Sequence, residues 1–256
     1  MSAGSSTLHK GLDLLKMMGR YPTGAPASVF ARESGLPFST AYRLLNTLVS
    51  SGFAEYEAET KLYRPGLAVF ELSANVTAAR GYDGIVLPIL QQLSATTNES
   101  CLFAVRDGLE SLTIRTVDGP EFRQTTDPGD RLPLHVSAMG KAILAGMPHD
   151  DAAALISEMA FEARTAHTVT DPTELLAQIE AGRKDGYVYQ REEVDEGMHA
   201  IGVPIISQGQ TVLGSLAIAA PLFRASEQEL IAHQEALAAA ARQLADMLPA
   251  LQSPTP

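Results

Sequence analysis

The stretch GLPFSTAYRLL, residues 35–45, decides the fold of the N-terminal part of this chain. Gly35 can adopt the left-handed backbone that ends a helix, and a helix is predicted just before it, over residues 27–34. A second helix is predicted over residues 39–51, with Ser39 as its N-cap and its leucines turned inward. Two helices joined by a tight glycine turn form a helix-turn-helix, in which the outer side of the second helix is left exposed.

Segments on either side of this stretch complete a small domain. A helix is predicted before it that ends near Gly19 and buries Leu8, Leu12, Leu15 and Met18. Two short strands are predicted after it, at residues 53–57 and 62–64, around a turn at residues 58–61. The order helix, helix, turn, helix, hairpin is typical of a winged helix-turn-helix, in which the hairpin is a wing over the DNA backbone.

Polar side chains on the second helix and on the wing are the candidates for DNA contact. Hydroxyl groups and a helix N-terminus suit phosphate oxygens, and an arginine can bind guanine through two hydrogen bonds. The candidates are Ser39, Thr40, Tyr42, Arg43, Asn46, Lys61 and Arg64. A small helical subdomain with solvated polar faces is the alternative that this pattern leaves open.

Length and charge give the two halves of the chain different roles. The chain has 256 residues, 45% of them hydrophobic, which predicts a folded protein of two domains. Its net charge is −11, but residues 1–66 hold seven Lys or Arg against five acidic residues. That segment is therefore +2 and the remainder −13, so only the N-terminal domain is expected to bind phosphates.

The sequence also predicts the compartment. The single cysteine, Cys101, cannot form an internal disulfide and has no spacing typical of a zinc site. No apolar run is long enough for a membrane span, and residues 1–7 do not resemble a signal peptide. We therefore expect a cytoplasmic protein without a membrane partner, metal or cofactor.

The chain after residue 66 is predicted to form a helix and then an α+β domain built around an antiparallel sheet. The helix, over about residues 67–80, is so apolar that we expect a dimer seam, with docking inside the chain as the alternative. Strands are predicted at 100–106, 109–117, 122–126, 187–191, 202–207 and 211–219. Helices are predicted at 84–97, 137–147, 150–162 and 172–186, with a final one after Ser226.

Several stretches resemble the IclR family of bacterial transcriptional regulators. They are GLPFSTAYRLL (35–45), LYRPG (62–66), LPLHVSAMGKAILA (132–145), TAHTVTD (165–171), Gly186-Tyr187 and EGMHAI (196–201). They cover nearly the whole chain in the order of the family. The resemblance implies a winged helix-turn-helix over 1–66, a linker helix over 67–81 and a GAF-like effector-binding domain over 82–251. Residues 252–256 are expected to be a disordered tail.

The same resemblance implies a function. Such proteins repress or activate nearby operons as homodimers or dimers of dimers, and we take a repressor as the expectation. The family often has a lysine where Phe38 stands and an arginine where Lys10 stands. Phosphate contacts are therefore expected to be fewer here.

The effector site departs from the family as well. Better-known members hold small carboxylic acids with an acidic side chain, a cysteine and two serines, which align here with Gln190, Ala200, Ala217 and Ala219. We expect a wider, apolar pocket that also includes Leu134, Met139 and Met198 and binds an aromatic acid or aromatic carbonyl compound. Gln190 would orient its polar end. The alternative is that the alanines only fill the core and the pocket lies elsewhere.

Other constellations were weighed as catalytic or metal sites, and none is predicted to be one. Ser137 and Lys141 lie four residues apart rather than three, and no second activating motif is present. Three of the six histidines, His135, His167 and His199, are expected to have capping or surface roles. The acidic residues Glu192, Glu193, Asp195 and Glu196 are expected to be solvated, and Cys101 to lie in the core. Two alternatives remain: a hydrolase of aromatic acyl compounds using Ser137 or Cys101, and a ligand sensor that acts through protein partners.

Overall fold

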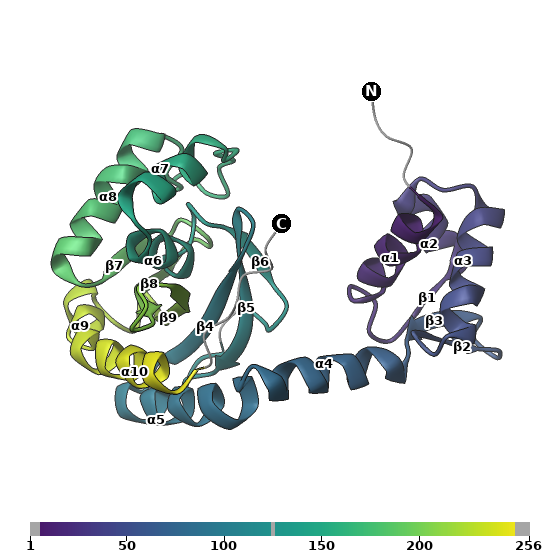
Figure 1. The fold of residues 1–256 in the computed structure, drawn as a ribbon, viewed down its shortest axis with the longest axis horizontal. Helices are drawn as coiled ribbons and strands as arrows, with labels where there is room; N and C mark the ends of the chain where they lie inside the picture. The colour runs from purple at the N-terminus through teal and green to yellow at the C-terminus, as the bar shows by residue number, and fades with distance from the viewer. Residues whose placement is uncertain (1–5, 124–125, 249–256) are drawn as a thin grey trace. The chain divides into compact units, whose positions relative to one another are not determined.

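The fold is described from a computed structural model, which covers residues 6–123 and 126–248. Internal contacts divide the chain into residues 1–77 and residues 78–256, and each unit is described by itself (Figure 1). The division falls inside the helix α4 (Leu67–Ala79).

The first unit is three helices and a small sheet. Its helices are α1 (Thr7–Met18), α2 (Ala27–Ser34) and α3 (Phe38–Ser50). Strands β1 (Ala25–Pro26), β2 (Ala54–Glu57) and β3 (Leu62–Pro65) form an antiparallel sheet in the order β1-β3-β2. Gly35 ends α2 with φ 67°, in the left-handed region predicted for the turn. The sequence did not indicate β1, which is only two residues long.

Two details of this unit were predicted wrongly. The N-cap of α3 is Pro37 rather than Ser39, because the carbonyl of Pro37 already accepts from the backbone N–H of Ala41 at 3.0 Å. In α1, Leu8 and Leu12 are exposed, and the buried side runs instead through Leu14 and Met18.

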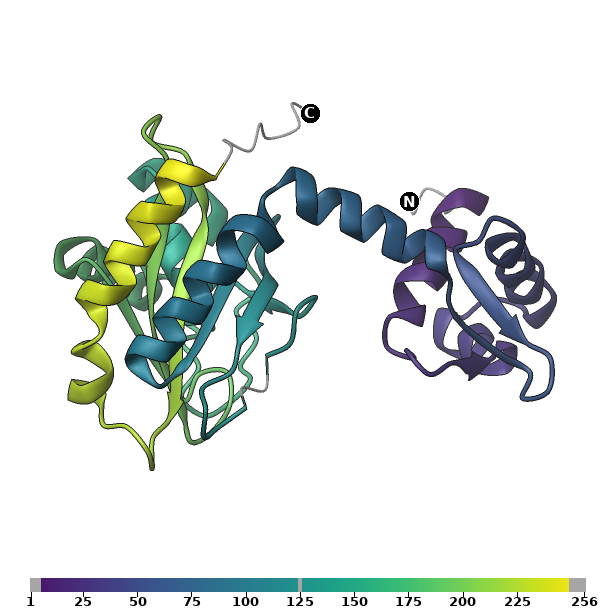
Figure 2. The ribbon, with the colours of Figure 1, turned by 90° about the horizontal axis from the view of Figure 1, so that it is seen from below.

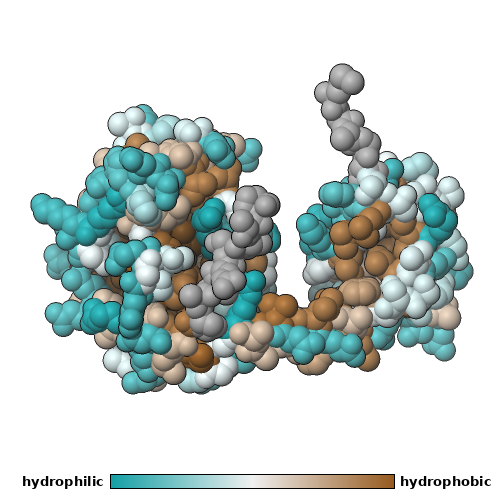
Figure 3. Space-filling model, in the orientation of Figure 1, coloured by the Kyte–Doolittle hydropathy of each residue, from teal (hydrophilic) through white to brown (hydrophobic). Residues whose placement is uncertain are grey.

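Helix α4 has an apolar surface that no part of the described chain buries. None of its residues is buried, and Leu67, Phe70, Leu72 and Val76 are all exposed. Figure 3 shows hydrophobic residues along this helix. Large exposed apolar patches are uncommon on monomers, so α4 is a candidate contact surface.

The second unit is built on a six-stranded antiparallel sheet of order β6-β5-β4-β9-β8-β7. Its strands are β4 (Ser100–Asp107), β5 (Glu110–Val117), β6 (Arg131–Pro133), β7 (Val188–Arg191), β8 (Met198–Ile206) and β9 (Val212–Pro221). Side chains alternate across the central strands. In β4, for example, Cys101 and Phe103 belong to one buried cluster, and Leu102 and Ala104 belong to another on the opposite face.

Helices cover both faces of this sheet. A π-helical turn, η1 (Tyr82–Val86), leads into α5 (Leu87–Thr97), which lies beside α10 (Gln234–Met247) over one face (Figure 2). Helix α6 (Ala138–Gly146) covers the other face, with α7 (His149–Ser157) and α8 (Pro172–Asp185) packed outside it. The short α9 (Glu227–Ile231) carries a capping box between Ser226 and Glu229.

Glycine lets α6 lie very close to the sheet. A Cβ atom on Gly202 of β8 would stand 2.5 Å from the carbonyl oxygen of Ala138, and one on Gly140 would stand 2.4 Å from that of Leu134. A larger residue at Gly202 would push α6 away from β8, and one at Gly140 would push α6 away from the backbone at Leu134. The position of α6 matters because it forms one wall of the cavity described below.

Several boundaries in this unit differ from the predictions. The strand predicted at 122–126 is absent from its described residues, and the sheet edge is instead β6 (Arg131–Pro133); residues 124–125 lie outside the described chain. The predicted final helix is broken between α9 and α10, and η1 replaces the first turn of the helix predicted at 84–97. The tail 252–256 lies outside the described residues. No helix within residues 6–123 and 126–248 is long and apolar enough to cross a membrane.

Candidate functional sites: a polar helix surface and a sheet-floored pocket

Helix α3 presents one continuous exposed surface. Its buried side consists of Ala41, Leu44 and Leu45, which pack on α1 and α2. On the opposite side, Ser39, Tyr42, Arg43 and Asn46 are exposed, and Thr40 is half-buried at the edge. The predicted DNA-contacting residues of this helix therefore lie together, with an arginine at their centre.

The wing holds the other two candidates. Lys61 lies in the β2–β3 turn with φ 58°, and Arg64 on β3 forms an exposed ion pair with Glu55 at 2.9 Å. The hydroxyl of Tyr63 donates to Oδ1 of Asn46 at 3.0 Å, which joins the wing to α3. An exposed ion pair contributes about 0–1 kcal/mol, so Arg64 can exchange Glu55 for a phosphate at little cost.

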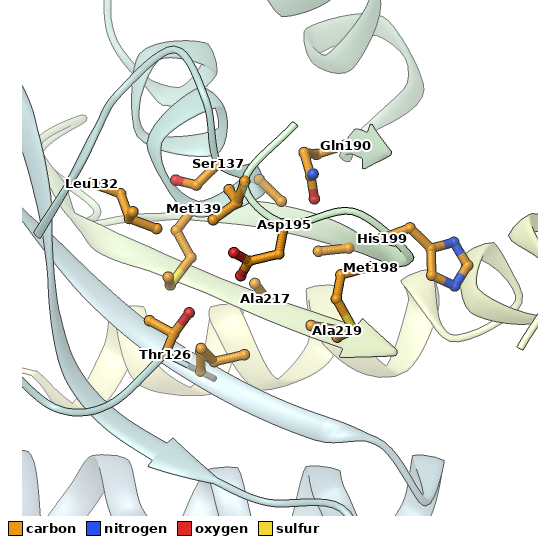
Figure 4. Close-up of a pocket in the computed structure, with 14 residues that line it drawn as sticks. Thr126, Leu132, Ser137, Met139, Gln190, Asp195, Met198, His199, Ala217 and Ala219 are labelled. Atoms are coloured by element: carbon orange, nitrogen blue, oxygen red, sulfur yellow. The ribbon is translucent and has the colours of Figure 1, made fainter. Parts of the chain in front are cut away.

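The second site is a pocket between the sheet and α6 (Figure 4). Its cavity volume is about 40 Å³, and the larger space of about 430 Å³ among its lining residues includes open solvent at the mouth. Its floor and wall are apolar, and one loop residue brings a carboxylate into it. The described lining residues are Leu102, Thr126, Leu132, Ser137, Ala138, Met139, Gln190, Val194, Asp195, Met198, His199, Ala200, Ala217 and Ala219.

Six of the seven residues predicted for the effector site line this pocket, and Leu134 does not. Leu134 is fully buried with Ile143 and Ile179 in the cluster between α6, α7 and α8, because it precedes α6 on the side away from the sheet. The three alanines come together because β8 and β9 pair in the register Ala200↔Ala219 and Gly202↔Ala217.

Sequence reasoning missed several lining residues, of which Asp195 matters most. It lies in the acidic segment 192–196 that was predicted to be solvated, and Figure 4 shows its carboxylate among the lining side chains. None of the described lining residues is a lysine or an arginine. Leu102 could have been found, since it alternates with Cys101 along β4.

Gln190 has only part of its carboxamide available for a ligand. With its oxygen facing the backbone, Oε1 accepts from the N–H of Glu193 at 2.6 Å and from that of Glu192 at 3.2 Å. This leaves the NH₂ group as the part that can donate to a bound molecule. A carbonyl oxygen is the natural partner of such a donor.

A buried ion pair holds the loop that carries Asp195. Lys141 of α6 donates to Glu193 at 2.5 and 2.6 Å and to Oε1 of Gln178 at 2.7 Å, with the two charged side chains 0% and 6% exposed. Glu193 also accepts from the backbone N–H of Val169 at 3.3 Å. Burial lowers the pKa of Lys141 and raises that of Glu193, while their attraction opposes both shifts. The prediction that Glu193 is solvated was wrong.

The histidines do not form a metal site. The prediction was capping or surface roles, but His135 and His199 are fully buried, so a surface role does not hold for them. Nδ1 of His199 lies 3.0 Å from the hydroxyl of Tyr189. Burial lowers the pKa of both imidazoles. His167 is exposed. No group of three or more His, Cys, Asp or Glu that could hold a metal ion occurs within residues 6–123 and 126–248.

The candidate nucleophiles have structural roles. The hydroxyl of Ser137 accepts from the backbone N–H of Gly140 at 3.0 Å as the N-cap of α6, and it lies 3.4 Å from that of Ser111. Cys101 is buried in the core, as predicted, and burial raises the pKa of its thiol to about 12. A thiolate, which is the reactive form, is therefore disfavoured at neutral pH.

We expect Cys101 to resist alkylation in the folded protein. At pH 8, iodoacetamide should modify less than about a tenth of the chains over an hour, since the thiol is both buried and protonated. In denaturant, where the thiol has its ordinary pKa, modification should be complete. Mass spectrometry of the intact chain measures both. Rapid labelling of the native protein would show that Cys101 is accessible and would revive the hydrolase alternative.

A winged helix-turn-helix on the same chain as a domain with an apolar pocket is the architecture of a ligand-responsive transcriptional regulator. Comparison with known proteins gives the family. The IclR helix-turn-helix domain matches residues 7–58, and the domain described as "bacterial transcriptional regulator IclR C-terminal" matches residues 83–246. The chain belongs to the IclR family of bacterial transcriptional regulators.

Individual relatives agree with this assignment. The regulator KdgR of Dickeya chrysanthemi is 33% identical over 215 residues, which cover 82% of this chain and 69% of that one. The repressor AllR of Escherichia coli K12 is 26% identical over 96% of this chain and 91% of its own. A crystal structure of an IclR homologue from Microbacterium hydrocarbonoxydans, complexed with 4-hydroxybenzoate, has 25% identity and a TM-score of 0.78, covering 94% of this chain and 98% of that one.

Proposed function

We propose that this regulator is a cytoplasmic repressor whose affinity for its operator is controlled by an aromatic acid or an aromatic carbonyl compound. The observation that carries the proposal is the pocket floor of Ala200, Ala217 and Ala219, on the same chain as the exposed surface of α3. No described residue of the pocket floor can hydrogen-bond a small polar acid through its side chain. A ligand can therefore make only apolar contacts with the side chains of this floor.

DNA binding is proposed to use α3 for base contacts and the wing for the backbone. Arg43 has the reach and the two parallel donors that guanine recognition needs, and Ser39, Thr40, Tyr42 and Asn46 surround it. Lys61 and Arg64 are proposed to contact phosphates, as cations on a wing do. The operator is expected to be a pseudo-palindrome, since two copies of the chain would each present one α3.

Replacing Arg43 with alanine should weaken binding to the operator by about 1–3 kcal/mol and relax its sequence preference. Replacing Lys61 with alanine should instead weaken binding to any duplex. It should also reduce the slope of log affinity against log salt concentration by about 1. Fluorescence anisotropy measures both on a duplex selected from a random pool and on a scrambled one. Lys184→Ala, an exposed cation on α8, is the control. Unchanged affinity and specificity in Arg43→Ala would contradict the role of α3.

The effector is proposed to be an aromatic acid or an aromatic carbonyl compound. The apolar lining offers contact area to a ring, and Gln190 lies among the lining residues as a polar group. The donor left on Gln190 suits a carbonyl or carboxylate oxygen. The 4-hydroxybenzoate bound by the Microbacterium homologue supports the aromatic part of the proposal only.

The pocket must rearrange to admit the aromatic ring of an effector. Met139 and Met198 share the space above the alanines, and unbranched thioether side chains can repack around an aromatic ring. The alternative that the alanines only fill the core is less well supported, because a cavity borders all three of them.

The protein is proposed to act as a homodimer or a dimer of dimers. The exposed apolar residues of α4 are the observation behind this, since a second copy of the chain would cover them. We propose that residues 67–81 serve as the linker between a DNA-binding domain over 1–66 and an effector-binding domain over 82–251. Neither a hydrolase nor a sensor acting through protein partners is favoured by any feature of the described residues.

A further inference from the structure

Two aromatic side chains stand exposed at the start of α3. Phe38 is 56% exposed and Tyr42 is 47% exposed, one helical turn further along. Their rings are stacked, with centroids 6.0 Å apart and planes 20° from parallel. The two rings therefore form one apolar surface on a helix whose neighbouring outward residues are polar.

This aromatic pair adjoins the surface proposed to contact DNA. Ser39 and Arg43 each follow one of the two rings directly in sequence, so they project from the same turns of α3. Asn46, one turn beyond Tyr42, is held to the wing by Tyr63. Phe38 and Tyr42 therefore lie next to the residues proposed to contact DNA.

The chemistry of the pair limits what it can recognise. A phenyl ring has no donor for a phosphate oxygen, so Phe38 makes no hydrogen bond to the DNA backbone. The 5-methyl group of thymine is the apolar feature that base pairs present in the major groove, and phenylalanine is among the side chains that contact it. Resting on the proposed DNA-binding role of α3, we propose that Phe38, stacked on Tyr42, reads thymine 5-methyl groups in each half of the operator.

The test removes the methyl groups without changing base pairing. A duplex is selected from a random pool with the full-length protein, and each thymine is then replaced singly by deoxyuridine. At one or two symmetry-related positions, affinity should fall about four-fold, which is the effect of burying one methyl-sized group. Replacing the equivalent thymines in both half-sites should lower affinity about fifteen-fold. Fluorescence anisotropy at constant salt measures each affinity.

Variants assign the effect to Phe38. In Phe38→Ala, binding should be weaker and the preference for thymine over deoxyuridine should disappear, while Phe38→Leu, still apolar, should keep most of it. Phe223→Ala is the matched control, because Phe223 is 86% exposed but lies between β9 and α9 in the other unit. Since Phe38 is already exposed, these variants should unfold at the same temperature as the wild type by circular dichroism.

Four results would overturn the proposal in distinguishable ways. If deoxyuridine has no effect at any position of a duplex that is still bound specifically, the thymine contact is wrong and the DNA-binding role stands. An equal effect in wild type and Phe38→Ala would assign the contact to another residue. If no sequence is selected and no duplex is bound, both the thymine contact and the proposed DNA-binding function are wrong. A change of oligomeric mass in Phe38→Ala, with the thymine preference intact, would show that the pair contacts protein instead.

Discussion

Replacing Lys141 with methionine is expected to destabilise the second unit by about 3–5 kcal/mol, because it leaves the carboxylate of Glu193 buried without its partner. The loss should shrink as the pH falls from 8 to 5. Burial raises the folded-state pKa of Glu193 above its unfolded value, so an unpartnered Glu193 destabilises fully above its folded pKa and ceases to do so once it is protonated.

Cys101 provides the readout for this unit alone. It is the only cysteine of the chain and is buried in the second unit, so its alkylation across a urea gradient reports unfolding there. The double variant Lys141→Met with Glu193→Gln should regain at least half of the lost stability, since glutamine removes the charge but keeps an acceptor for the N–H of Val169.

The matched control is an ion pair at the surface. Arg131 and Asp107 are paired at 2.5 Å with both side chains exposed, so Arg131→Met should lower stability by less than about 1 kcal/mol. Equal losses in Lys141→Met and Arg131→Met would contradict the account of the buried pair. Lys141→Met should also weaken effector binding, because the ion pair between Lys141 and Glu193 holds the loop that carries Asp195.

Introducing serine at both Ala217 and Ala219 is expected to reverse the ligand preference of the pocket. Each hydroxyl would face an aromatic ring without a partner, which should weaken an aromatic ligand by about 1–3 kcal/mol per residue. A small polar acid should bind better, since the two hydroxyls can donate to its oxygens.

Calorimetry with three ligands tests this. Wild-type protein should bind 4-hydroxybenzamide and 4-hydroxybenzoate more tightly than glycolate, because glycolate has no ring to contact the apolar floor. The double variant should lose affinity for the amide and gain affinity for glycolate. Serine at Ala238, on α10 and outside the pocket, is the control. An unchanged order of ligands in the double variant would place the effector site elsewhere.

Local patterns predicted the parts of the fold that depend on neighbours in sequence. Gly35 marks the turn because a left-handed residue ends α2, and the leucines of α3 face inward with the expected period. The buried side of α1 was misplaced because Gly11 was not counted as apolar. A Cβ on Gly11 would stand 4.0 Å from Leu44, so this glycine faces α3 and turns Leu8 and Leu12 outward.

The site could be predicted only in part, since much of it joins distant residues. Alternation along β9 places Ala217 and Ala219 on one face, which the sequence does indicate. Lys141 and Glu193 are 52 residues apart, and a run of acids in a loop gives no sign that one of them is buried against α6. For the same reason Asp195 was missed and Leu134 was wrongly included.

The central claim is that one chain couples a ligand in the pocket to DNA on α3, and a linkage measurement tests it most directly. The affinity for the selected duplex is measured with and without the aromatic compound that binds most tightly in calorimetry. The affinity for that compound is then measured on free protein and on the DNA complex. The account predicts that both affinities change by the same factor, about 5- to 150-fold. A ligand that occupies the pocket and leaves the affinity for DNA unchanged would contradict it.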